Sequence, residues 1–294
     1  QIEIMRRWIA EGAKWGRHWS FEPVVKPQGT IDSLVKETLA VMKLTLRPRA
    51  APHTLIRRLH LDLTGLPPSD LSDKSDLSAQ DYEALVDSLL NSQAFGEHWA
   101  RMWLDLARYA DTKGYEKDLG RTIWPWRDWV VNALNADMPL DQFTLEQLAG
   151  DLLPNPTEQQ IIATAFHRNT MSNDEGGTDN EEFRIAAVKD RVDSTIQVWM
   201  GLTMGCAKCH SHKYDPISNE EYYRVFALFN QTQDADLPDD SPKLSKPTPE
   251  QAKTVADATK RLNELRDQLT KASGKDVKDK ELEKEDPADK PEIA

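Results

Sequence analysis

The sequence predicts an all-α protein, built as an irregular multi-helix domain with a C-terminal helical extension. Three observations lead to this fold class. Apolar residues recur at spacings of three and four along nearly the whole chain, which is the period of an amphipathic helix. Helix start and stop signals separate these stretches. No stretch alternates apolar and polar residues convincingly, as a half-buried strand would.

Several stretches carry the helical period strongly enough to be taken as helices. The clearest places Trp99, Trp103 and Leu106 on one stripe with Met102 and Tyr109. In chain order, the predicted helices cover 32–45, 53–63, 79–91, 94–110, 126–136, 158–168, 180–205 and 219–231.

Capping signals mark where several of these helices begin and end. Three pairs of residues have the spacing of a capping box, in which two side chains bond to backbone N–H groups of the first turn. They are Ser78 with Asp81, Thr144 with Gln147, and Thr157 with Gln160. The proline-containing stretches 65–68 (GLPP) and 153–156 (LPNP) predict helix ends.

Beyond the helical region the composition changes. Residues 236–253 are rich in Pro, Asp and Ser and predict a linker. In 254–294, apolar residues first follow a heptad spacing, which predicts a coiled-coil-like helix, and a charged tail follows. The heptad residues are Val255, Ala258, Leu262, Leu265, Leu269 and Ala272.

Composition limits the classes of partner. The chain has 294 residues and a net charge of -12, so it lacks the positive balance typical of a nucleic-acid-binding protein. No apolar run reaches the 18 residues or so that a membrane-spanning helix needs. Gln1 stands inside an amphipathic helical pattern, so we expect this chain to be a segment of a longer protein.

Both cysteines of the chain stand in one motif, Cys206-Ala-Lys-Cys209-His210. C-x-x-C-H is the attachment sequence of c-type haem, in which the two thiols add across the porphyrin vinyl groups and the histidine binds the iron. We therefore predict a haem attachment loop with Cys206, Cys209 and His210 as its functional residues. Covalent haem attachment takes place outside the bacterial inner membrane, so a periplasmic or otherwise exported location follows.

Other uses of the two cysteines stay open at this stage. A thioredoxin-like dithiol would need a preceding strand and a βαβ setting, and no β-rich run precedes Cys206. A zinc site could use Cys206, Cys209 and His212, but a fourth ligand is not evident. Two merely structural thiols would leave His210 unexplained.

Several long motifs resemble one family. They are 55–68 (LIRRLHLDLTGLPP), 103–111 (WLDLARYAD), 124–129 (WPWRDW), 147–154 (QLAGDLLP), 174–177 (DEGG), 190–191 (DR) and 206–216 (CAKCHSHKYDP). Over about 30–235 the chain resembles the domain of unknown function that follows the planctomycete cytochrome c domain in large exported proteins of planctomycetes and their relatives. The resemblance implies haem, export and a multidomain context, but no reaction.

The resemblance also implies a domain organisation. Residues 1–29 would be the tail of an upstream cytochrome c domain with a linker, and 30–235 the all-α haem domain. That upstream cytochrome c domain and other redox proteins are then the expected partners.

A haem iron needs a sixth ligand or an open sixth position. Met or His at this position is typical of electron carriers, whereas an open position permits oxygen or peroxide chemistry. His167 and Met171 are the predicted iron ligands beside His210, and His167 is preferred because it ends an apolar-faced helix. The competing interpretation of either residue is ordinary packing.

Residues that flank the motif have predicted roles too. His212 is expected to bind a haem propionate or accept a redox-linked proton, and Lys213 to pair with a propionate. The acidic loop 173–182 could hold calcium, place Glu175 as an acid or base beside Arg184 or Arg191, or simply cap the following helix.

The nine tryptophans raise a last alternative. Arg108, Asp111, Arg127 and Asp128 lie among Trp103, Trp124, Trp126 and Trp129, and this pattern predicts ion pairs buried in an aromatic cluster. Packing is preferred over a sugar site here. Three functions remain: electron transfer by a c-type haem domain, a haem-linked oxidoreductase acting on a small molecule or carbohydrate, and a binding module stapled by metal or haem.

Overall fold

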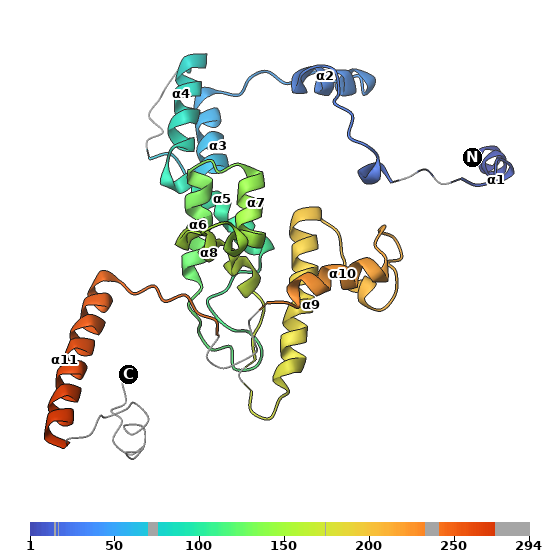
Figure 1. Cartoon of the computed structure of the whole chain (residues 1–294). Helices are drawn as coiled ribbons and strands as arrows, with labels where there is room; N and C mark the ends of the chain where they lie inside the picture. Colours follow the sequence, from blue (N-terminus) through green and yellow to red (C-terminus); the bar gives the residue numbers. More distant parts are fainter. Residues whose placement is uncertain (15, 17, 70–75, 174, 233–240, 274–294) are drawn as a thin grey trace. The chain divides into compact units, whose positions relative to one another are not determined.

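The computed structural model describes residues 1–14, 16, 18–69, 76–173, 175–232 and 241–273. In this part of the chain the regular secondary structure is helical, as the sequence predicts, and an isolated bridge joins Thr112 to Gly120. The chain divides into two compact units, Gln1–Leu90 and Asn91–Ala294 (Figure 1). None of the helices within the described ranges has the length and apolar character that crossing a membrane requires.

The first unit contains four α-helices and a short 3-10 turn in its described residues. They are α1 (Ile2–Ala10), η1 (Trp19–Phe21), α2 (Ile31–Val41), α3 (Pro52–Thr64) and α4 (Ala79–Leu90). α3 ends at Gly65, whose left-handed backbone (φ 68°) suits glycine, and α3 packs against α4. The predicted cap at α4 is confirmed, since the Asp81 N–H donates to Ser78 Oγ at 3.1 Å.

The second unit carries the remaining elements. They are α5 (Gln93–Leu106), α6 (Trp124–Asn135), α7 (Leu140–Ala149), η2 (Gly150–Leu152), α8 (Glu158–Ala163), η3 (Thr164–Arg168), α9 (Asn180–Met200), η4 (Gly205–Lys208), α10 (Asn219–Phe229) and α11 (Pro249–Ser273). α5 packs along α6, and α9 against α10 (Figure 1).

An aromatic core fills the space between α5, α6, α7 and α8. Trp126 is completely buried, and Trp129 stacks on Phe143 with ring centroids 5.3 Å apart. Trp103 meets both Phe143 (4.9 Å) and Trp199 of α9 (5.2 Å) edge to face. The preference for packing over a sugar site is confirmed for Trp126 and Trp129, which lie inside the core. We call the cluster of eleven buried residues to which these rings belong, with the partly buried Trp103 and Trp199 packed against it, the aromatic core.

One predicted cap is wrong. Thr144 and Gln147 lie inside α7, which follows Pro139 and begins at Leu140. Their side chains instead bond to tryptophans of the aromatic core: Thr144 Oγ1 accepts from Trp199 Nε1 at 3.0 Å, and Gln147 Oε1 from Trp103 Nε1 at 2.9 Å. The same polar side chains that could cap a helix satisfy buried indole N–H groups here.

A second, smaller core joins α9, η4 and α10. Its buried members are Val192, Met204, Ala207 and Tyr222. α10 starts with a capping box between Ser218 and Glu221, which fixes the start of the helix that follows the cysteine motif along the chain. We call this set of four residues the small core.

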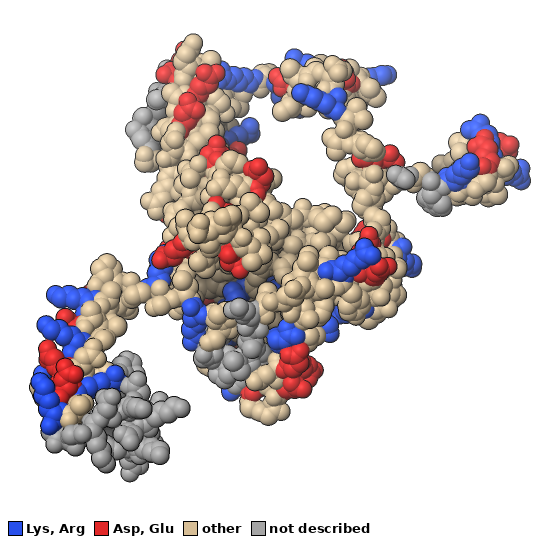
Figure 2. Space-filling view, in the orientation of Figure 1, with Lys and Arg blue, Asp and Glu red and all other residues tan. Residues whose placement is uncertain are grey.

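The C-terminal helix α11 matches the predicted helical extension and begins at Pro249, inside the stretch taken as a linker. Its heptad residues Val255, Leu262 and Leu269 are exposed. In Figure 2, Lys and Arg side chains alternate with Asp and Glu over α11 and over α2. The charged tail beyond Ser273 lies outside the described residues.

Candidate functional site

The cysteine motif lies on a short turn that follows α9. The sequence predicted that this helix continues to about 205, but α9 ends at Met200, and Gly201 takes a left-handed conformation (φ 64°). The Gly201 N–H donates to the Gln197 carbonyl. The chain then turns again in η4, which carries Cys206. We call residues 205–210 the attachment turn.

Backbone hydrogen bonds close the attachment turn. The Ala207 N–H donates to the Met204 carbonyl at 2.8 Å, and the Cys209 N–H to the Cys206 carbonyl at 3.4 Å. Ala207 and Met204 are buried, whereas both cysteines are exposed and free of a disulfide. The turn is therefore anchored by its apolar residues and presents its two thiols to solvent.

His210 is exposed beside the thiols, and its hydrogen bond fixes its tautomer. Its Nδ1 lies 2.8 Å from the carbonyl oxygen of Ser211. A carbonyl can only accept, so Nδ1 carries the proton and the lone pair lies on Nε2. A backbone acceptor on the far nitrogen is the usual arrangement of a metal-binding histidine. Two exposed thiols and this imidazole fit the donors that a c-type haem requires.

His212 lies inside the loop that follows, and its ring holds that loop together. Nδ1 accepts the backbone N–H groups of Asp215 (2.8 Å) and Tyr214 (3.2 Å), and Nε2 lies 3.4 Å from Thr203 Oγ1. Because Nδ1 accepts two hydrogens, it carries no proton, and its 3.6 Å separation from Asp215 Oδ2 is proximity rather than an ion pair. The His212 ring therefore links the backbone of Tyr214 and Asp215 to the side chain of Thr203 and stabilises the loop.

Lys213 projects from the same loop as an exposed cation. Its Nζ lies 5.1 Å from the ring centroid of Tyr214, which is itself largely exposed. This is the distance of a cation–π contact at the surface. The ammonium group is therefore accessible to an anionic ligand, and its predicted pairing with a propionate stays a prediction.

Two residues of α10 that sequence reasoning missed hold the attachment turn from the other side. Asn219 Nδ2 donates to the Ala207 carbonyl at 2.7 Å, and Tyr223 Oη donates to the Lys208 carbonyl at 2.9 Å. The Ser218–Glu221 capping signal could have indicated that α10 begins here, although it gives no hint of these contacts. They are visible only once α10 lies against the turn.

Arg108 forms an ion pair with Asp190 of α9, the helix that precedes the attachment turn. Its guanidinium donates to both oxygens of Asp190 on α9, at 2.7 and 2.8 Å, and to the Ser194 hydroxyl. The hydrogen bond to Asp190 raises the pKa of Arg108. The side chains of Arg108 and Asp190 are 50% and 31% exposed, so the prediction of a fully buried pair is wrong.

The second pair also lies near the surface. Arg127 binds its neighbour Asp128 at 2.7 Å, and both side chains are almost half exposed. Asp111 forms no such pair among the described residues: its carboxylate accepts a hydrogen bond from the Tyr109 hydroxyl. The pKa of Tyr109 is raised, mainly by burial. Trp126 and Trp129 bury their rings, whereas the charged groups of both ion pairs are partly exposed, where water reduces the cost of desolvation.

The two predicted distal ligands lie in different surroundings. His167 is partly buried between Phe166 (5.3 Å) and Phe229 (4.9 Å), and its Nε2 is 3.4 Å from the Leu148 carbonyl oxygen. Met171 is exposed and lies over Gly114, where a Cβ would fall 2.6 Å from Met171 Cγ. Met171 therefore packs against the loop around Gly114. A role for His167 or Met171 as an iron ligand stays a prediction.

The acidic loop serves as a cap in the part that the structure describes. Asp179 accepts the Glu181 N–H at 2.9 Å and is the N-cap of α9, which confirms the capping interpretation. Arg184 binds Glu181, and Arg191 donates to the His167 carbonyl. Among the described residues no group of three His, Cys, Asp or Glu could hold a metal ion. Asp174 lies outside the described residues.

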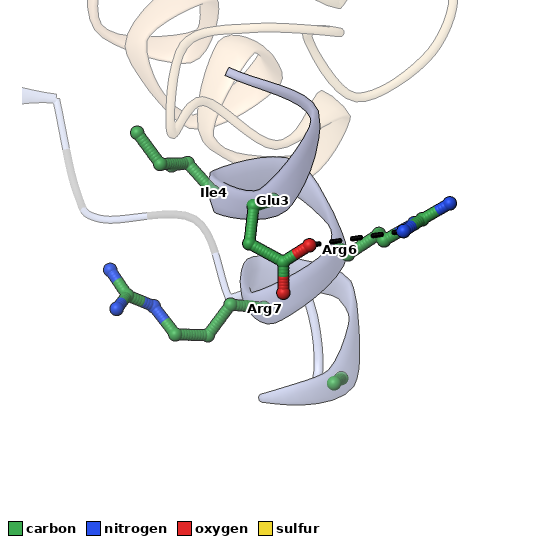
Figure 3. Close-up of a pocket in the computed structure, with 5 residues that line it drawn as sticks. Glu3, Ile4, Arg6 and Arg7 are labelled. Carbon is green, nitrogen blue, oxygen red and sulfur yellow. Dashed lines mark ion pairs between the residues drawn. The ribbon is translucent and has the colours of Figure 1, made fainter.

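Two surface hollows of the described residues are lined by residues outside the cysteine motif. The hollow drawn in Figure 3 is lined by residues of α1 alone, with Glu3 and Arg6 paired at 3.8 Å and Ile4 and Arg7 beside them. Another is an apolar surface of α7 that includes Leu140, Leu145 and Leu148.

Comparison with known families gives one match. A family model described as PSCyt2, a protein of unknown function (DUF1549), matches residues 30–234, well over half of the chain. Neither the curated proteins nor the solved structures contain a match.

Proposed function

The chain belongs to the PSCyt2 family (DUF1549), and from this premise we propose that its attachment turn carries a covalent c-type haem and that the domain transfers electrons. Cys206 and Cys209 would form the two thioether bonds, each thiol adding its sulfur to one vinyl carbon and its hydrogen to the other. His210 would bind the iron through Nε2. The haem supplies one-electron redox chemistry when it is bound.

The observation that carries this proposal is the hydrogen bond of His210. The Ser211 carbonyl orients the ring and holds the proton on Nδ1, so the lone pair for the iron lies on Nε2 beside two exposed thiols. A zinc site that recruits His212 is less favoured. The Nδ1 of that ring already accepts two backbone N–H groups, so the proton of the neutral ring lies on Nε2 and neither nitrogen has a free lone pair for a metal.

The haem proposal brings a location and partners with it. Covalent attachment takes place outside the bacterial inner membrane, so we propose that the protein is periplasmic or otherwise exported. Electrons would pass to and from an upstream cytochrome c domain or another redox protein. Lys213 would pair with a haem propionate, since its ammonium group is exposed on the loop next to His210.

The test is to produce the chain in a host with cytochrome c maturation machinery and record spectra with a pyridine haemochrome assay. We expect covalent haem with sharp low-spin bands in both oxidation states. Cys206→Ser with Cys209→Ser should abolish attachment, and His210→Ala should change the spectrum. His53→Ala, an exposed histidine of α3, is the matched control and should leave the spectrum unchanged. His167→Ala and Met171→Ala identify the sixth ligand.

Other results would redirect the proposal. A high-spin spectrum that shifts with cyanide would overturn electron transfer in favour of a haem-linked oxidoreductase. A protein that binds no haem under these conditions would refute the proposal, and its zinc content should then be measured. Such a protein, with one zinc per chain, would be a metal-stapled binding module.

A further inference from the structure

Two buried oxygen atoms next to the attachment turn have no hydrogen-bond partner among the described residues. One is the hydroxyl of Tyr222, a residue that is completely buried. The other is Oδ1 of Asp193 on α9. A buried polar atom that lacks a partner costs about 1–3 kcal/mol, so its presence needs a physical explanation.

Both side chains lie directly beneath the turn. A Cβ on Gly205, the first residue of η4, would fall 2.9 Å from Asp193 Oδ2, so the carboxylate lies against the residue before Cys206. Tyr222 belongs to the small core together with Ala207 of the turn and Val192, the neighbour of Asp193. The carboxylate approaches from α9 and the phenol from α10.

The charged groups that affect Asp193 lie on η4, on α9 and just after α5. Burial is the largest cause and raises the pKa of Asp193; the positive charge of Lys208 lowers it, Asp190 raises it and Arg108 lowers it. Arg108 is already bound by both oxygens of Asp190. The net result is a carboxyl group that holds its proton more tightly than usual.

Tyr222 is suited to be the partner of this carboxyl group. Burial is the first cause that raises its pKa to about 12, followed by the negative charges of Asp193, Tyr223 and Cys209. The phenol therefore stays protonated at neutral pH and can donate a hydrogen bond.

We propose that Asp193 and Tyr222 form a buried proton-binding site beneath the attachment turn, and that this site couples haem oxidation to proton release. The coupling rests on the proposed function. Asp193 takes up one proton from water when one electron arrives from a donor redox protein. It releases that proton to water when the electron leaves for a one-electron acceptor. The structure describes both side chains and shows no hydrogen bond between them, so Tyr222 would move toward the carboxylate form and donate one to it.

The proton site itself is tested on the haem-free chain, because this measurement does not depend on the haem. The carboxyl 13C signal of Asp193, identified by its loss in Asp193→Asn, should titrate with a pKa above the usual value of about 3.9. In Tyr222→Phe the titration should move to still higher pH, because the carboxylate loses a donor. Tyr82→Phe, the same change on α4, should leave it in place. A titration at or below the usual value would overturn the proton site.

The coupling is tested on the haem-loaded chain by measuring the reduction potential from pH 3 to 9, a range that begins below the usual pKa of an aspartate, about 3.9. The wild-type potential should fall as pH rises through the Asp193 pKa, because the carboxylate stabilises the oxidised form. Asp193→Asn should lose this dependence, and Glu182→Gln, an exposed acid on the same helix, should keep it. Equal curves for wild type and Asp193→Asn would overturn the coupling while the haem function stands. A chain that takes up no haem would refute the proposed function, and the titration above still decides the proton site.

Discussion

The two cores of the second unit differ in size and in what lies above them. The aromatic core buries eleven residues, among them Trp126 and Phe166, and its indoles of Trp103 and Trp199 are bonded to side chains of α7. The small core buries four residues, and the exposed cysteines lie directly on it. Burial of apolar surface is the main favourable term in folding, so the aromatic core should carry most of the stability. The small core mainly holds the attachment turn in place.

The largest expected effect on stability comes from removing a ring from the aromatic core, the larger of the two cores. Trp126→Ala should lower the free energy of unfolding of the haem-free chain by about 3–5 kcal/mol, because a completely buried indole leaves a cavity. Trp124→Ala, at a half-exposed position of the same helix, is the matched control and should cost much less. Urea denaturation measures both. Equal losses would show that the aromatic core is not the stabilising centre.

A smaller loss is expected when the support of the attachment turn is weakened. Asn219→Ala removes the hydrogen bond to the Ala207 carbonyl and should cost about 1 kcal/mol of unfolding free energy. The yield of covalent haem should fall as well, since the turn is less well held. The control is Glu220→Ala, whose exposed pair with Arg224 contributes little. An unchanged haem yield in Asn219→Ala would show that α10 does not position the cysteines.

The smallest effect is a change in the pH dependence of stability. The raised pKa of Asp193 means that the folded chain binds this proton more tightly than the unfolded chain, whose Asp titrates near about 3.9. This contribution is present at low pH and is lost as pH rises through the folded pKa. Asp193→Asn should therefore be more stable than wild type at pH 7 and equal to it near pH 3. A loss of stability at pH 7 would contradict the desolvated carboxylate.

Helix positions followed well from the sequence because they depend on local period. The helices around Trp103, Tyr82 and Tyr222 agree to within a few residues with stretches whose apolar spacing indicates them. α7 is the exception. Its apolar pattern is weak, and Thr144 and Gln147 mimic a cap, because these side chains serve buried tryptophans that lie far away along the chain.

The site was predictable as far as its chemistry is local. Cys206, Cys209 and His210 are adjacent, so their motif is readable without a fold. The structural role of His212 was not predictable, because it depends on which atoms form hydrogen bonds with its ring nitrogens. The same holds for Asn219, whose type and position along the chain give no sign of its contact with the turn.

The sequence by itself determined that this chain is helical, where most helices lie, which family it belongs to, and that two thiols and a histidine stand in a haem-attachment spacing. These features depend on neighbours along the chain. The tertiary structure decided which side chains surround that motif: the Ser211 carbonyl that orients His210, and the carboxylate of Asp193 and phenol of Tyr222 beneath the turn. Such contacts join α9, η4 and α10, and they exist only when packing brings distant segments together.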